Sequence, residues 1–119
     1  MSTKAPRVLL VVTSDPRSSA RPAEAVRIAA GVATWRKVVF DLYLQGPAVL
    51  ALSEFTDDLV DDDNFNRYLP VFRELGRPVY VESGSPHLND LGEAPVPWET
   101  LDAAGVARLA AGTTALMRF

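Results

Sequence analysis

The run RVLLVVT, from Arg7 to Thr13, constrains the fold of this chain more than any other segment. It is continuously apolar after its first residue and rich in β-branched side chains, which is typical of a strand covered on both faces. Strands of that kind lie inside parallel sheets, with helices packed on either side. The run is too short for a signal peptide's apolar region or a membrane span, so we interpret it as a central strand.

A helix is predicted to follow this strand after a polar loop. Pro22 suits a first helical position, and Glu24 lies in the first turn. Apolar residues then recur at helical spacing and cover an arc of about 220°, which is wider than one sheet face needs. Either the surplus contacts another subunit, or neighbouring helices of the same domain bury it. The residues of this face are Ala25, Ile28, Ala29, Val32 and Trp35, widened by Val26, Ala30 and Ala33.

The rest of the chain alternates between predicted strands and helices. Strands are expected at 38–44, 78–81 and 113–119, and helices at 48–52, 65–75 and 102–111. The segment 83–97 is rich in Gly, Pro and Ser and is predicted to be loop, with a short strand near Val96. Alternation of strands and helices indicates an α/β fold with a mostly parallel sheet and helices on both faces.

Helix boundaries follow from capping residues. Asp63 is predicted to cap the helix around 65–75, and Thr100 or Asp102 the helix at 102–111. Pro70 lies inside the first of these patterns, so either that helix kinks or its regular part starts at Pro70.

Length and composition narrow the functional classes. The 119 residues fit a single domain spanning 1–119. The chain has no cysteine, which excludes disulfides, thiolate nucleophiles and Cys-ligated metal sites within it and is compatible with a cytoplasmic location. With a net charge of -3 and no cluster of basic and aromatic residues, we expect no nucleic acid as a partner, and no membrane either.

Ligands of open parallel sheets bind outside the carboxyl ends of the strands. Three segments are expected to meet there, namely 14–21, 45–47 and 82–87. Their polar and turn residues form the candidate ligand site, with no catalytic residue, metal or cofactor assigned. These residues are Ser14, Arg17, Ser18, Arg21, Gly46, Glu82, Ser83 and His87.

The first of these segments has the character of an anion site. Two arginines and several hydroxyls precede a helix N-terminus, which favours anions. No glycine lies between Ser14 and Pro22, however, so neither a P-loop nor a dinucleotide fingerprint is present. The alternative is that the serines cap the helix and the arginines are solvated.

The remaining candidates are also open to two interpretations. His87, the only histidine, is either a general acid/base or an exposed loop residue. Glu82 is either a base or a capping or salt-bridging residue. Ser83 lacks the glycines of a nucleophile elbow. The aspartates between 57 and 63 lack the glycine and glutamate of a calcium loop, so we predict no metal site there.

The chain resembles the DsrE-like family, the small proteins related to the sulfur-relay subunits DsrE/DsrF/DsrH and TusB/TusC/TusD. The resemblance is carried by four segments that together cover nearly the whole chain. These are RVLLVVTSDP with RPAEAVRIAAGVA, then VVFDLYLQGPAVLAL, then LPVFRELGRPVYVESG, and finally GVARLAAGTTALMRF.

This resemblance implies a three-layer α/β/α sandwich with a five-stranded sheet of flavodoxin-like topology, assembled as a homo-oligomeric trimer or hexamer. Sulfur-carrying members have a cysteine just after the third strand. The matching position here is Glu82 or Ser83, neither of which can carry a persulfide. The chain is therefore expected to be a cysteine-less member that does not transfer sulfur.

Two functions are consistent with these observations. The first is a non-catalytic, oligomeric DsrE-like protein that binds a small ligand or a partner at the carboxyl edge of the sheet. The alternative is a small enzyme acting on an anionic metabolite, with Arg17 and Arg21 binding the anion and Glu82 or His87 transferring a proton. The absence of a compact nucleophile or acid/base motif favours the first.

Overall fold

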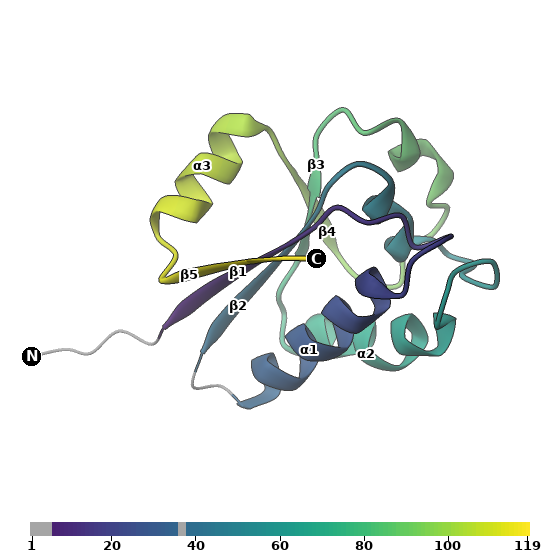
Figure 1. Ribbon diagram of the computed structural model, residues 1–119, viewed down its shortest axis with the longest axis horizontal. Coiled ribbons are helices and arrows are strands. Elements are labelled where there is room, and N and C mark those ends of the chain that lie inside the picture. The colour runs from purple at the N-terminus through teal and green to yellow at the C-terminus, as the bar shows by residue number, and fades with distance from the viewer. Residues whose placement is uncertain (1–5, 36–37) are drawn as a thin grey trace, which may run out of the picture.

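The computed structural model describes residues 6–35 and 38–119, and these residues form a five-stranded sheet with helices on both faces (Figure 1). The strands are β1 (Arg7–Val12), β2 (Val39–Leu44), β3 (Val79–Glu82), β4 (Trp98–Leu101) and β5 (Ala115–Arg118). The α-helices are α1 (Arg21–Trp35), α2 (Asp62–Glu74) and α3 (Ala103–Ala111), and two 3₁₀ helices are η1 (Gly46–Leu52) and η2 (Pro86–Asp90).

All strand pairings in this sheet are parallel, in the order β4-β3-β2-β1-β5. The interior position of β1 confirms the interpretation of the RVLLVVT run. Leu10 lies between Leu42 of β2 and Met117 of β5, and it is fully buried.

The layers follow from the path of the chain. It steps from β1 to β4 in one direction, with its first connections on one face, and then returns through α3 to place β5 beside β1 (Figure 1). Because parallel crossovers are right-handed, reversing the direction of travel places α3 on the opposite face from α1 and α2. The result is the three-layer α/β/α sandwich predicted from the sequence.

The two faces of the sheet are covered unequally. On the face of α1 and α2, a large core includes Phe65, Leu69 and Phe72 of α2 together with small residues of α1. On the other face, the buried apolar residues are Leu9, Val11 and Tyr43, with partly buried neighbours from β3, β4 and α3. Only Gly105 of α3 is fully buried, so this face has thin cover.

The wide apolar arc of the first helix is explained within the chain. Alanines along α1 pack in the core with the aromatic residues of α2, and the side-chain amide of Asn64 donates to the carbonyl of Ala23 at 3.4 Å. Of the two explanations offered by the sequence, burial under a neighbouring helix therefore accounts for the alanines of this surface, whereas Trp35 at the end of the helix is 62% exposed.

Several expected boundaries are wrong. The helix α2 begins at Asp62 and runs through Pro70 without a fresh start, and its cap is Asp61, in a left-handed conformation with φ 54°, rather than Asp63. The capping role of Asp102 is confirmed, since its carboxylate accepts from the amide of Gly105 at 2.7 Å.

The fourth strand lies at Trp98–Leu101 rather than near Val96. Val96 is flanked by Pro95 and Pro97, which have no N–H to donate to a ladder. Val96 instead packs in the core, and the pairing with β3 begins only after Pro97. No helix among the described residues has the length and apolar character required to cross a bilayer.

Candidate functional site

The carboxyl ends of β2 and β3 are joined by Glu82. Its Oε1 accepts from the backbone N–H of Gly46 at 3.1 Å, and its Oε2 accepts from Nε2 of Gln45 at 3.2 Å. Gly46 has a φ of 59°, which a residue with a side chain rarely adopts, and this conformation begins the turn into η1. Glu82 therefore has the bridging role that the sequence offered as one of its two interpretations.

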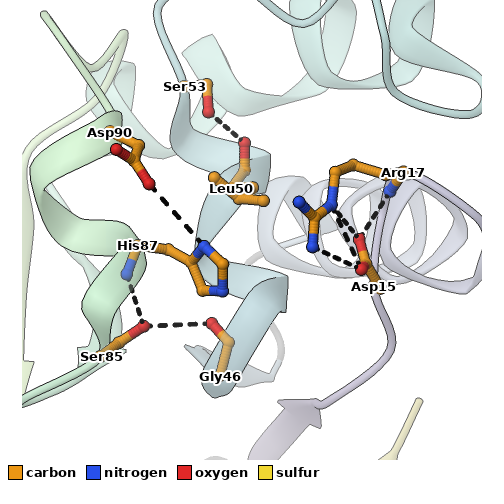
Figure 2. Close-up of polar contacts among 8 residues, drawn as sticks. All are labelled: Asp15, Arg17, Gly46, Leu50, Ser53, Ser85, His87 and Asp90. Carbon is orange, nitrogen blue, oxygen red and sulfur yellow. Dashed lines mark hydrogen bonds and ion pairs between the residues drawn. The ribbon is translucent and has the colours of Figure 1, made fainter.

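A second polar contact ties the loop after β3 to the same turn (Figure 2). The hydroxyl of Ser85 donates to the carbonyl of Gly46 at 3.3 Å and accepts from the backbone N–H of His87 at 3.4 Å. The Nδ1 atom of His87 lies 3.9 Å from a carboxylate oxygen of Asp90. Two of the three segments expected at this edge are thus in direct contact.

The third segment, the loop after β1, lies close to this contact. Arg17 binds Asp15 through two side-chain nitrogens, with Nη2 to Oδ2 at 2.8 Å (Figure 2). This hydrogen bonding is the main reason that the pKa of Asp15 is lowered, and the nearby His87 adds a smaller electrostatic contribution. The first loop and the histidine therefore lie within electrostatic range of each other.

The predicted anion-binding arginines have partners inside the chain. Arg17 is paired with Asp15, and the guanidinium of Arg21 lies 5.5 Å from the ring centroid of Phe119. The Ser14 hydroxyl donates to the Phe119 carbonyl at 3.0 Å, while Ser18 is exposed. These contacts tie the first loop to the end of β5, and the Asp15 carboxylate neutralises the charge of Arg17.

A cavity of about 540 Å³ lies at the same edge of the sheet, on the face of α3. Of the predicted site residues, Glu82 and Ser83 line it, and Ser14, Arg17, Ser18, Arg21, Gly46 and His87 do not. Its floor is the sheet and its wall is the first part of α3. The lining residues are Val11, Tyr43, Gln45, Glu82, Ser83, Leu101, Asp102, Ala103, Val106, Leu116 and Arg118.

Tyr43 is one of several lining residues that were not among the predicted site residues. It is 4% exposed, and burial, followed by the negative charge of Glu82, raises the pKa of its hydroxyl. It pairs in register with Val11 on one side and Tyr80 on the other. The alternation along the second strand could have indicated this residue. Tyr43 lies on the same, more polar face as Asp41, and it is close to the carboxyl end of the strand, where ligands are expected.

Metal binding has no support in the described ranges 6–35 and 38–119. They contain no group of three or more His, Asp or Glu side chains arranged to hold a metal ion. The aspartates Asp61, Asp62 and Asp63 surround the start of α2, together with Arg67.

Comparison with known proteins identifies the fold. No protein-family model matches the chain, and no curated protein shows a significant match. Among solved structures, the crystal structure of the YchN protein from E. coli is similar, with a TM-score of 0.77 over 96% of this chain and 99% of that one. The sequence identity is 15%, so this likeness concerns the fold alone. The fold of this chain is DsrE-like, a flavodoxin-type three-layer architecture with an all-parallel sheet.

Proposed function

We propose that this chain is a single-domain, cytoplasmic, cysteine-less member of the DsrE-like family that binds a small ligand and catalyses no sulfur transfer. The observation that carries the proposal is the cavity of about 540 Å³ at the carboxyl edge of the sheet. Its volume is in the range of small-molecule sites, and its lining mixes apolar side chains with a few polar groups, as such sites do.

The position of this cavity agrees with the family resemblance. By this resemblance, Glu82 or Ser83 matches the position of the cysteine in sulfur-carrying members, and both residues line the cavity. The cavity is therefore present although no cysteine lines it. A carboxylate and a hydroxyl can hold a ligand by hydrogen bonds but cannot form a persulfide.

Assembly into a homo-oligomer is part of the same proposal. The edge strand β5 is exposed along its whole length, with Leu116 45% and Met117 42% exposed. Edge strands present unpaired backbone groups that a second chain can cover. The enzyme alternative has less support. Two of the residues that it requires, Arg17 and His87, each lie against a carboxylate of the chain itself.

A thermal-shift screen tests the ligand proposal. The wild-type protein is screened against amines, amino acids, organic acids, phosphates and nucleotides, and at least one class is expected to raise the melting temperature. Val106→Phe fills the cavity without removing a hydrogen bond and should abolish the shift, as should Glu82→Ala. Arg17→Ala, which lies outside the cavity, should retain it.

The proposal fails if no compound stabilises the protein, or if the shift survives Val106→Phe. A shift lost only in Arg17→Ala would move the site to the first loop. Turnover of a bound compound that depends on His87 would establish the enzyme alternative instead.

A further inference from the structure

The hydroxyl of Tyr43 has no hydrogen-bond partner in the described chain, although the residue is 4% exposed. No fully enclosed side-chain nitrogen or oxygen of the described residues lacks a partner, so this hydroxyl is not sealed off. Because Tyr43 lines the cavity, its hydroxyl is accessible from there. A buried phenol normally finds a partner, and here the cavity is the place from which one can come.

Two carboxylates lie at the same end of the cavity. Glu82 receives one hydrogen bond at each oxygen and keeps further lone pairs. Asp102 receives the amide of Gly105 at Oδ1, and its Oδ2 has no partner among residues 6–35 and 38–119. Since Asp102 already caps α3, an anion at this helix N-terminus would meet negative charge rather than an empty dipole end.

Most of the remaining lining is apolar, and Arg118 supplies a positive charge on the far side. Val11, Leu101, Val106 and Leu116 supply hydrocarbon surface. Arg118 is in register with Val11, which is in register with Tyr43, so Arg118 lies two strand spacings, roughly 10 Å, from the tyrosine strand. The guanidinium of Arg118 has no partner in the described part of the chain. The cavity thus has an acidic end, an apolar middle and a basic end.

We propose that this cavity binds a small amphipathic amine, held by the Tyr43 hydroxyl and the carboxylates of Glu82 and Asp102, with its hydrocarbon body against Val106. A protonated amine offers three donors and no acceptor, and these three side chains offer acceptors on the side of the cavity that runs from β2 to the end of β4. Arg118 accommodates a carboxylate at the far end, so ω-amino acids, whose hydrocarbon chain separates the ammonium from the carboxylate, also fit. This inference rests on the proposed function, because it names the ligand class of that cavity.

Three probes with hydrocarbon bodies of similar size test the ligand class. Isoamylamine carries the amine alone, 6-aminohexanoate carries an amine and a carboxylate separated by five methylene groups, and 4-methylpentanoate carries the carboxylate alone. Each is titrated into ¹⁵N-labelled full-length protein, and dissociation constants are taken from shifts of the backbone amides of Ser83 and Val106. Isoamylamine and 6-aminohexanoate should shift these amides, with 4-methylpentanoate at least about tenfold weaker.

Matched variants separate recognition from packing. Tyr43→Phe keeps the ring and removes the hydroxyl, and should weaken isoamylamine by about three- to tenfold. Glu82→Gln should weaken it by about tenfold or more, because it removes a charged acceptor. Tyr80→Phe makes the same change on the neighbouring strand, at a residue that does not line this cavity, and should leave the affinity unchanged.

The outcomes distinguish this inference from the proposed function. If 4-methylpentanoate binds as tightly as isoamylamine, or if Tyr43→Phe and Tyr80→Phe behave alike, the amine assignment is wrong while the cavity remains a ligand site. If none of the probes shifts these amides but another compound from the thermal screen does, the assignment is also wrong. If no compound of any class binds in the cavity, the proposed function fails with it.

Discussion

The burial of Tyr43 should make the free energy of unfolding depend on pH in the alkaline range. Its folded-state pKa is raised above the unfolded value of about 10, first by burial and then by Glu82. The corresponding stability is fully present below about pH 10, and it is lost as the pH rises from there through the folded-state pKa, because the unfolded chain releases the proton first. As the pH rises above 10, the free energy of unfolding should therefore fall less for Tyr43→Phe than for the wild type.

Urea unfolding at a series of pH values, together with the near-ultraviolet absorbance of phenolate, measures this difference. The chain has three tyrosines, and Tyr43→Phe should remove a transition that lies above pH 10. Tyr80→Phe keeps Tyr43 and should keep that transition. Parallel losses of stability in Tyr43→Phe and wild type would contradict the prediction.

At the scale of elements, a buried ion cluster ties β1, β2 and the start of β3 together. The carboxylate of Asp41 is 1% exposed and receives Nε of Arg7 at 2.9 Å and Nη2 of Arg77 at 2.6 Å. Each arginine is partly exposed and can reach water when its partner is lost, whereas the carboxylate cannot. The cost of breaking the cluster should therefore depend on how many arginines remain with Asp41.

Arg7→Ala and Arg77→Ala should each lower the free energy of unfolding by about 1–2 kcal/mol. The double variant should lose more than the sum, by about 1 kcal/mol or more, because Asp41 is then buried without a partner. Urea unfolding of all four proteins gives this coupling energy. In an Asp41→Asn background the arginine substitutions should cost much less, and simple additivity in the wild-type background would refute the argument.

The elements that could be predicted from the sequence are those set by local patterns. The apolar run of β1, the helical spacing of α1 and the cap of α3 at Asp102 are all readable along the chain. The strand β4 was misplaced because Val96 is as apolar as a strand residue, while the prolines beside it prevent pairing.

The cavity could not be derived, since it depends on which residues of β1, β2 and β3 share a row. That register is set by contacts between distant segments, so only Glu82 and Ser83 were placed correctly in its lining.

The whole molecule presents one thinly covered face and two exposed edge strands, β4 and β5, of which β5 is exposed at every residue. The helix α3 alone covers its side of the sheet, and cavities of about 540 and 320 Å³ lie against it. Beside it, β5 is paired with β1 and forms the end of the sheet. Burying this exposed four-residue edge in a second copy removes unpaired backbone groups and apolar surface from water together.

The family resemblance implies a trimer or hexamer, which we expect the wild-type protein to form at micromolar concentration, and the exposure of β5 leads us to expect that strand in the interface. Met117→Glu places a charge on an exposed position of β5, and it should shift the assembly toward monomer because burying that charge is costly. Phe55→Glu, at a residue that is 77% exposed and lies outside β5, should leave the mass unchanged. Gel filtration with light scattering measures the masses, and circular dichroism checks that both variants are folded. A monomeric wild type would refute the assembly, whereas an oligomer that persists in Met117→Glu would place the interface away from β5.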